Sequence, residues 1–480
     1  MNLRDLSGMK VTIMGLGLHG GGIESARFFA KAGARVLVTD LRKSEILKPS
    51  IDALGDFAID FVLGEHRIDD FATADLVIKN PAVKRNNPFL QAAKAVHTDI
   101  SVFLSLYKGP VLGITGTKGK SSTSSALAHG LRTVIPSTRL GGNITVSPLG
   151  FLTEIEKTPN TPVVLELSSF QLGDLLMSAT NLSLQFSAIT NIHRDHQDYY
   201  GEMEAYVQDK ERIFLQQRPE TWACFFADQG EWTNRFLSRL PRGVQGMVVG
   251  SKWEAVQNYP GSLGRLWLDE GRGLYRAPYS EGAPIELVPS EVQVPGDHQK
   301  INLGVAAIGM LQQGIDGESI RQGLCSFGGI PHRLEFVGTL DGVRVYNDSA
   351  ATIPEAVVAA TTSFSGPIHL ICGGTDKDLD FRALGSLTNR CSSISVLGGT
   401  ASGKIMQTFR EAGFGPDRLE GPFETLEECL DRGMNAASQS PENERTLVFS
   451  PGCASFGKFL NEFDRGNKFR ALVQNRLQGL

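Results

Sequence analysis

Cysteine, excess basic charge and long apolar runs are all scarce in this sequence. Six cysteines among 480 residues are scattered without a CxxC pair, which argues against a zinc knuckle or a disulfide framework and favours a reducing compartment. A formal net charge of −5 makes nucleic acid an unexpected partner. The run Met9–Gly17 is too short to span a bilayer, and the start carries no cleavage-site pattern. We therefore expect a cytoplasmic protein without a membrane partner.

Short apolar runs that end in glycine-rich turns recur along the chain, and helix-compatible stretches follow several of them. This pattern is typical of buried strands in parallel α/β sheets. The runs are Lys10–Met14, Arg35–Thr39, Pro110–Ile114, Val163–Leu167, Ile368–Cys372, Ile394–Leu397 and Thr446–Phe449.

The runs fall into three clusters, which predicts an α/β protein of three domains, consistent with a chain too long for one core. One boundary is expected near Tyr107–Pro110, where a Lys-Gly-Pro turn precedes a new strand, and another near Phe327–Pro331. The predicted domains are 1–108, 109–329 and 330–480. Between Gly246 and Pro295 the pattern becomes more β-like, and Trp267–Tyr275 predicts a hairpin.

The segment Gly113–Thr123, with the sequence GITGTKGKSST, indicates a phosphate-binding loop between a strand and a helix. Backbone N–H groups of such a loop, together with the helix N-terminus, surround phosphate oxygens. Lys120 would reach the outer phosphates and Ser121 would bind magnesium. Ile114 stands where the strict Walker spacing has its first glycine, so an ordinary glycine turn is the alternative. The predicted ATP-binding residues here are Gly116, Thr117, Lys118, Gly119, Lys120, Ser121 and Ser122.

A second glycine motif, Gly15–Gly20, follows the first strand and has the spacing GxGxxG, with Asp40 twenty residues beyond it. On its own this motif leaves three interpretations open. It is compatible with NAD or NADP binding, with a Rossmann-like turn that simply needs glycine, and with another nucleotide diphosphate bound at a helix N-terminus.

Polar residues stand at two further strand ends in the middle of the chain. Glu166 ends an apolar strand, where an unpaired charge is costly, and the turn Thr190–Asp198 contains His196. Together with the phosphate loop they indicate a divalent metal site. By contrast, the amphipathic pattern around Lys210 alone predicts a solvated lysine, and His298 and Asn302 are equally compatible with helix capping.

Four polar segments in the last third follow strands or glycine turns. Each alone is compatible with plain turn chemistry, but four in one domain favour a binding face at the carboxyl ends of a sheet. The segments are Pro331–Glu335, Tyr346–Thr352, Gly373–Lys377 and Ser450–Ser455.

In this order, the motifs resemble the Mur ligase family of peptidoglycan precursor synthesis. The resemblance extends from Gly15 to Arg470, and its most discriminating pieces are Gly116–Thr123, Glu166–Leu172, Asp195–Asp198, and Ser450–Phe456 with Arg465-Gly466. The sequence ELSSFQL resembles the corresponding motif of the family members that add D-glutamate. The resemblance implies a Rossmann-like N-terminal domain, a P-loop-type central ATPase domain with a mostly parallel sheet, and a Rossmann-like C-terminal domain.

It also implies a monomeric, ATP-dependent ligase that uses two Mg²⁺ ions and joins D-glutamate to UDP-N-acetylmuramoyl-L-alanine through an acyl phosphate. NAD is then not needed, because the first domain would hold the UDP part of the substrate. The implied UDP-substrate residues are Gly15, Leu16, Gly17, Leu18, His19, Gly20, Asp40, Arg42, Asn143, Ser168 and Gln171.

The resemblance assigns the remaining roles as follows. Catalysis would depend on Lys120, Glu166, His196 and Lys210. The metal ligands would be Ser121, Glu166, His196 and, if carbamylated, Lys210. Further ATP contacts would come from His298, Gln299, Asn302, Arg333 and Asp348. D-Glutamate would meet Thr352, Lys377, Ser455 and Phe463.

Four positions depart from the family pattern. Ala350 replaces a common lysine, Gln299 an asparagine, Gly457 an aspartate, and Glu462 an aromatic residue that is instead found next to it as Phe463. An acidic side chain beside an acidic amino acid would repel it, so these changes bear on amino-acid specificity. Two alternatives stay open: a superfamily member with another amino acid or a folate-like acceptor, and a nucleotide-sensing switch without amino-acid-stimulated turnover.

Overall fold

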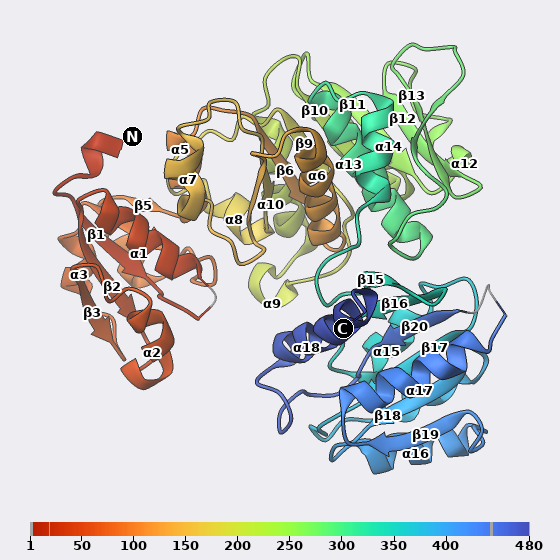
Figure 1. Cartoon of the computed structure of the whole chain (residues 1–480). Coiled ribbons are helices and arrows are strands. Elements are labelled where there is room, and N and C mark those ends of the chain that lie inside the picture. The colour runs from red at the N-terminus through yellow and green to blue at the C-terminus, as the bar shows by residue number, and fades with distance from the viewer. Residues whose placement is uncertain (1–2, 19, 442–444, 480) are drawn as a thin grey trace. The chain divides into compact units, whose positions relative to one another are not determined.

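The computed structural model describes residues 3–18, 20–441 and 445–479, so the predicted site residue His19 lies outside the described part. The chain divides into two compact units (Figure 1). One comprises Met1–Ser290 with Ile301–Leu324, and the other Glu291–Lys300 with Cys325–Leu480. The predicted boundaries at 108/109 and 329/330 stay predictions.

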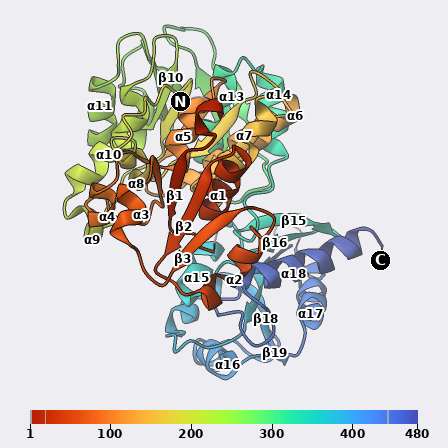
Figure 2. The ribbon, with the colours of Figure 1, turned by 90° about the vertical axis from the view of Figure 1, so that its left-hand side faces the viewer.

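The N-terminal sheet has parallel strands in the order β3-β2-β1-β4-β5. Helix α1 packs against β1 and β2, and Figure 2 shows it beside them. This is the predicted Rossmann-like arrangement, in which the first glycine motif joins β1 to α1. The strands are β1 Lys10–Met14, β2 Arg35–Asp40, β3 Ile59–Leu63, β4 Leu76–Lys79 and β5 Val96–His97. The helices are η1 Leu3–Leu6, α1 Gly21–Lys31, α2 Ser44–Asp52, α3 Ile68–Ala72, α4 Pro88–Gln91 and α5 Asp99–Leu106.

The central sheet has the order β14-β13-β12-β11-β10-β9-β6-β8-β7 and is parallel except at β13 and β14. The predicted hairpin is confirmed as β12 and β13. The strands are β6 Val111–Thr115, β7 Arg139–Gly142, β8 Val163–Glu166, β9 Phe186–Ile189, β10 Trp222–Phe226, β11 Gln245–Gly250, β12 Gly264–Asp269, β13 Arg272–Arg276 and β14 Ile285–Val288. The helices are α6 Lys120–Val134, α7 Leu149–Ile155, α8 Ser169–Asp174, α9 Gln197–Tyr200, α10 Met203–Leu215, η2 Ala227–Gln229, α11 Glu231–Ser238, α12 Trp253–Val256, α13 Asp297–Gln312 and α14 Gly317–Cys325.

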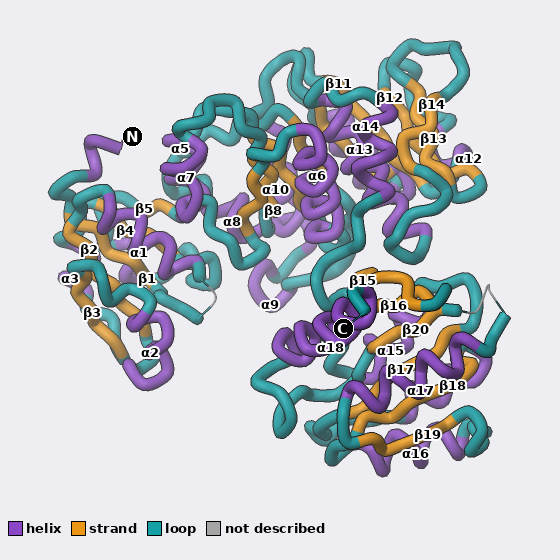
Figure 3. Tube along the Cα trace, in the orientation of Figure 1, coloured by secondary structure: helices purple, strands orange, loops and turns teal. Residues whose placement is uncertain are grey.

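The C-terminal sheet has the order β15-β16-β20-β17-β18-β19, with only the β15–β16 pair antiparallel. Figure 3 shows its strands with α17 and α18 beside them. The strands are β15 Glu335–Leu340, β16 Val343–Asn347, β17 Ile368–Gly373, β18 Cys391–Leu397, β19 Leu419–Phe423 and β20 Thr446–Phe449. The helices are α15 Pro354–Thr361, η3 Arg382–Asn389, α16 Ser402–Glu411, α17 Leu426–Ser438 and α18 Glu462–Leu477.

Strands β4, β6, β8 and β9 are buried along their whole length. Such strands need apolar side chains on both faces, which is why they appear in the sequence as continuous apolar runs. The helix after the phosphate loop begins at Lys120, so Lys120 and Ser121 lie in its first turn. Within the described ranges, no helix has both the length and the apolarity to cross a membrane.

Arg465 fixes two loops at the carboxyl ends of β16 and β20. It lies on α18 with its side chain fully buried. Its guanidinium donates to the hydroxyl of Ser349 at 3.0 Å, to the carbonyl of Ser349 at 2.9 Å and to the carbonyl of Cys453 at 3.0 Å. Burial lowers the pKa of Arg465 to about 10, which leaves the group charged near neutral pH.

Replacing Arg465 with methionine should therefore destabilise the C-terminal domain. Three buried acceptors would lose their donor, and we expect a loss of roughly 3 kcal/mol in the free energy of unfolding. Urea unfolding measures it. Lys468→Met, an exposed change on the same helix, is the control and should stay within about 0.5 kcal/mol of the parent. Equal effects of the two substitutions would contradict this role for Arg465.

Candidate active site

The phosphate loop is held by the turn that follows β9. The backbone N–H of Thr117 donates to the carbonyl of Asn191 at 2.8 Å, and that of Lys118 to the Asn191 side-chain oxygen at 2.8 Å. Gly116 has φ of +143°, and a Cβ there would collide with the Thr190 hydroxyl. Glycine at this position is thus required both by conformation and by space.

Two lysines meet at the carbonyl of Gly116. Lys120 Nζ donates to it at 3.1 Å and to the Thr117 carbonyl at 2.9 Å, while Lys210 Nζ donates to it at 2.8 Å. Lys210, on α10, is only 1% exposed, so the expectation of a solvated lysine drawn from its local pattern is wrong. Burial, reinforced by the positive charge of Lys120, lowers the pKa of Lys210 to about 7. Burial also lowers the pKa of Lys120.

Glu166 ends β8 beside these lysines, and its charge acts on both of them. Its Oε1 accepts from Asn143 Nδ2 at 3.0 Å, whereas its Oε2 is buried and accepts no hydrogen bond. A buried carboxylate oxygen without a partner is unfavourable unless a cation satisfies it. Oxygen is also the donor that Mg²⁺ prefers, so Glu166 fits the predicted metal site.

The other predicted metal ligands differ in their position and in their exposure to solvent. Ser121 lies in the first turn of α6. His196 has φ of +52° and is half-exposed, with its ring 4.9 Å from that of Phe170 and 6.2 Å from that of Tyr206. Across the described ranges there is no cluster of three or more His, Cys, Asp and Glu side chains that could hold a metal. The predicted set therefore depends on the Ser121 hydroxyl and on modification of Lys210.

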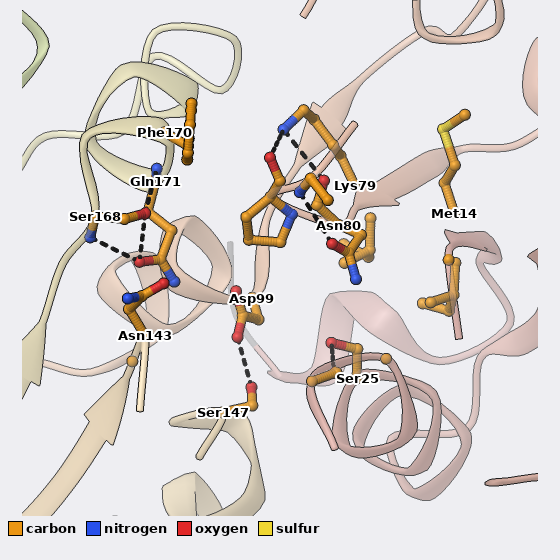
Figure 4. A pocket seen from close by; sticks show the side chains of 18 of the residues that line it. Met14, Ser25, Lys79, Asn80, Asp99, Asn143, Ser147, Ser168, Phe170 and Gln171 are labelled. Carbon is orange, nitrogen blue, oxygen red and sulfur yellow. Dashed lines mark hydrogen bonds between the residues drawn. The ribbon is translucent and has the colours of Figure 1, made fainter. Parts of the chain in front are cut away.

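A cavity of about 390 Å³ lies between the N-terminal and central sheets of the first unit (Figure 4). Its lining includes four of the predicted UDP-substrate residues: Gly15, Asn143, Ser168 and Gln171. Ser168 and Gln171 form a capping box at the start of α8, in which the Ser168 backbone N–H donates to the Gln171 side-chain oxygen at 3.0 Å.

Several lining residues were not predicted from the sequence. Asn80, Pro81 and Ala82 follow β4. A polar Asn-Pro turn after an apolar run is the sequence signal that could have indicated this lining segment. Asp99 lies at the start of α5, and its carboxylate accepts a hydrogen bond from the Ser147 hydroxyl at 2.8 Å. Burial raises the pKa of Asp99. The complete set missed is Ile13, Met14, Gly21, Gly22, Ser25, Ile78, Lys79, Asn80, Pro81, Ala82, Asp99, Gly142, Thr145, Ser147 and Phe170.

The other predicted UDP-substrate residues gather around Asp40. Its Oδ2 accepts from the backbone N–H of Leu16 at 3.0 Å and of Gly17 at 3.2 Å, and its Oδ1 from that of Arg42 at 2.9 Å. Asp40 is buried and orders the glycine loop, while the Arg42 side chain is exposed. Leu18 is also exposed, and Gly20 precedes the first residue of α1.

The predicted ATP contacts on α13 are divided between the two compact units. Asn302 belongs to the first, where its Oδ1 accepts from the Thr123 hydroxyl at 3.3 Å next to the phosphate loop. His298 and Gln299 belong to the second unit. His298 and Asn302 both lie inside α13, which begins at Asp297, so they do not cap it.

In the second unit, Asp348 lies beneath the ends of β16 and β20. Its carboxylate accepts from the Ser450 hydroxyl at 2.7 Å and the Leu334 backbone N–H at 3.1 Å. Burial raises the pKa of Asp348 to about 7, opposed in part by the nearby charge of Arg333. Arg333 itself is exposed.

The predicted amino-acid residues lie on the same sheet edge. Lys377 Nζ lies 4.7 Å from the ring centre of Phe456, which follows the buried Ser455. Thr352 is partly buried after β16. Phe463 lies with its ring 5.8 Å from that of His332, whereas Glu462 accepts a hydrogen bond at its backbone carbonyl from the Ser349 hydroxyl.

Family models match both sheets of the first unit. The model for the Mur ligase middle domain matches residues 114–310, and that for the Mur ligase MurD-like N-terminal domain matches residues 9–102. The UDP-N-acetylmuramoylalanine--D-glutamate ligase of Roseiflexus sp. (strain RS-1) is 40% identical over 98% of this chain and 99% of its own. The chain belongs to the Mur ligase family. The ligase of the same name from Treponema pallidum (strain Nichols) is 37% identical over 98% of both chains.

Solved Mur ligase structures share the fold. The UDP-N-acetylmuramate-alanine ligase MurC from Thermotoga maritima superposes with a TM-score of 0.54 at 19% identity, covering 98% of this chain and 100% of its own. MurF ligase from Thermotoga maritima, solved in complex with ADP, gives a TM-score of 0.50 at 16% identity, with 99% and 97% covered. The predicted family fold, α/β with mostly parallel sheets, is thus confirmed for this Mur ligase.

The raised pKa of Asp348 predicts a pH-dependent stability for this Mur ligase. Because the carboxyl binds its proton more tightly when folded, folding takes up a proton between about pH 4 and pH 7. The free energy of unfolding should then fall by up to about 1.4 kcal/mol per pH unit across that window. Asp348→Asn keeps an acceptor for one of the two donors and removes the titration. Urea unfolding at a series of pH values should show that the free energy of unfolding of the variant rises relative to that of the parent as the pH increases to 7. A difference in unfolding free energy that does not change with pH would contradict this prediction.

Proposed function

We propose that this chain is an ATP-dependent ligase that adds D-glutamate to UDP-N-acetylmuramoylalanine. The observation that carries the proposal is the position of Glu166. One carboxylate oxygen is bound by Asn143, which lines the 390 Å³ cavity, and the other lies unpartnered beside the lysines of the phosphate loop. A nucleotide phosphate and a carboxylate substrate would meet there. The relatives that match nearly the whole chain carry this activity in their names.

The reaction begins with transfer of the γ-phosphoryl group of ATP to the terminal carboxylate of the nucleotide-sugar substrate, which yields an acyl phosphate and ADP. The amine of D-glutamate then attacks the acyl carbon, an amide bond forms, and phosphate leaves. Phosphoryl transfer depends on positioning and on neutralising charge. The backbone of Gly116–Ser122 would hold the phosphates, and Lys120 would supply positive charge to the transferred group.

Ser121, Glu166, His196 and a carbamylated Lys210 would hold Mg²⁺, which neutralises phosphate charge when bound. Lys210 favours modification because its pKa of about 7 leaves a large fraction of neutral, nucleophilic amine near pH 7. Carbamylation replaces a cation with a carboxylate at the position where Lys210 now donates to Gly116. This removes the repulsion between Lys210 and Lys120.

The cavity beside the N-terminal sheet would hold the nucleotide-sugar substrate. Gly15 lines it directly after β1, and Gly21 and Gly22 line it at the start of α1, where backbone N–H groups favour a diphosphate. Asp40 and Arg42 remain predicted contacts to the uracil, and Asn143, Ser168 and Gln171 to the rest of the substrate. The ATP-binding roles of His298, Gln299, Asn302, Arg333 and Asp348 also stay predictions.

Lys377, Thr352 and Ser455 would receive D-glutamate, with Lys377 as the cation for a carboxylate. Glu462 stands where the family pattern has an aromatic residue, and the neighbouring Phe463 would take its place. The contact of Phe463 with the His332 ring keeps an aromatic side chain beside the predicted D-glutamate residues. The lysine missing at Ala350 has no replacement on the same loop, where Ala350 donates from its backbone to the His332 carbonyl. Specificity for D-glutamate therefore needs direct measurement.

Phosphate release tests the activity and its amino-acid substrate together. With ATP, Mg²⁺ and UDP-N-acetylmuramoyl-L-alanine, we expect release only when D-glutamate is added, and at least about a hundredfold less in Lys120→Ala, because the transferred charge loses its cation. Lys157→Ala, an exposed change, is the control. Release with L-glutamate or another amino acid would reassign the substrate, and no release with any would refute the ligase.

Glu166→Gln tests the metal role. Glutamine retains an acceptor for Asn143 but lacks the anionic oxygen. We expect the Mg²⁺ concentration for half-maximal phosphate release to rise by about tenfold or more. Glu154→Gln, at an exposed carboxylate, serves as the matched control. An unchanged Mg²⁺ dependence with a lower maximal rate would remove Glu166 from the metal site.

A further inference from the structure

Four charged residues connect the N-terminal domain to the central domain, and of these only Lys79 was named above, as a lining residue of the cavity. They are the interdomain ion network: Lys79, the last residue of β4; Arg85, between β4 and α4; Asp174, the last residue of α8; and Asp209 on α10. Lys79 and Asp174 have exposed side-chain fractions of 0% and 1%, Asp209 of 7% and Arg85 of 27%.

The contacts run as a chain from one domain to the other. Lys79 Nζ is hydrogen-bonded to the Asp174 carboxylate and donates to the carbonyl of Asn80 at 3.2 Å. Arg85 Nε lies 3.4 Å from Asp174 Oδ1, and Arg85 Nη2 donates to Asp209 Oδ2. Arg85 is thus the member that joins α8 and α10 to the N-terminal domain at once.

The network contains two cations and two anions, and Arg212 of α10 also contacts Asp209. A buried ion pair adds little net stability over apolar residues of similar volume, but removal of one partner leaves a charge uncompensated. Charge-assisted hydrogen bonds also fix geometry closely. The network is therefore better suited to setting the relative position of the two domains than to adding stability.

Both walls of the cavity are attached directly to this network. Asn80, Pro81 and Ala82 line the cavity immediately after Lys79, and Ser168 and Gln171 line it on the helix that ends at Asp174. In Figure 4, Ser168 and Gln171 lie on one side of the cavity, and Lys79 and Asn80 lie on the other. Lys79 is hydrogen-bonded to the loop that follows it. A change in the network would alter the separation between the walls.

Gly173 provides independent support. A Cβ at this position of α8 would collide with the Arg85 guanidinium and with the Asp209 carboxylate. The helix approaches the pair so closely that any larger residue requires the Arg85 side chain to move. Gly173→Ala should then displace Arg85 without removing any charge.

We propose that the interdomain ion network is a positioning device that sets the separation of the cavity walls and thereby the affinity for the nucleotide-sugar diphosphate substrate. Arg85 is its central positioning residue. The substrate assignment rests on the proposed function, whereas the mechanical role of the network does not.

Kinetics separates positioning from general damage. Arg85→Met should raise KM for the nucleotide-sugar substrate about tenfold and leave KM for ATP within about twofold, because the phosphate loop lies within the central domain. Arg85→Lys should recover part of the loss. The matched control is Arg212→Met: Arg212 contacts the same Asp209 at 3.3 Å but from within α10, so KM should stay unchanged. Equal effects of the two substitutions, or a matching rise in KM for ATP, would overturn the proposal.

Hydrogen exchange in the protein without substrates tests the network independently of turnover. Arg85→Met and Gly173→Ala should each speed amide exchange in the loop 80–87 and in α8, and Arg212→Met should not. Unchanged exchange in both variants would overturn the positioning role. If the parent protein shows no D-glutamate-dependent phosphate release, the proposed function fails while this comparison still decides the fate of the network.

Discussion

The structure of the site depends on charge buried at the carboxyl ends of the central strands. Lys120 and Lys210 both donate to the Gly116 carbonyl, and Glu166 contributes a carboxylate oxygen that accepts no hydrogen bond. Burying these groups is costly, and their mutual arrangement offsets only part of the cost. A phosphate would offset the lysine charges, a cation would satisfy the unpartnered Glu166 oxygen, and carbamylation of Lys210 would remove one positive charge. The charges that are costly to bury are thus the ones that would bind ligands.

Helix α10 shows how selectively that charge is managed. A buried carboxylate stands on each side of Lys210: Asp209 before it and Glu211 after it. Each forms an ion pair with an arginine from another part of the chain. Arg85 contacts Asp209, while Arg235 donates to Glu211 at 2.8 Å. Burial and the charge of Lys120 lower the pKa of Lys210 by more than the nearby carboxylates, Asp209 among them, raise it. The helix is held from two directions with its lysine directed at the phosphate loop.

Glu166 and the interdomain ion network couple the two ligand regions of the first unit. Asn143 binds Glu166 from the cavity side, and Lys79 binds Asp174 at the end of the helix that carries Ser168 and Gln171. The cavity and the phosphate loop are consequently linked through Glu166 and through the packing of α8 against α10. A shift between the two domains would move the cavity walls, whereas the phosphate loop would keep its place within the central domain.

The sequence alone determined the strands of the seven apolar runs and the hairpin, the three-part α/β organisation, the strand–loop–helix segment that contains Lys120 and Ser121, and the family, because strand periodicity and glycine-rich turns are local signals. Tertiary structure alone decided the burial of Lys210, which its helix pattern placed in solvent, and the cavity contribution of Asp99 and Asn80. It also decided the pairing of Lys79 with Asp174, 95 residues apart. A local pattern specifies an element and where it ends. Whether a charged side chain on that element meets water, a carbonyl or an opposite charge depends on which distant segments pack against it, and no local pattern contains that information.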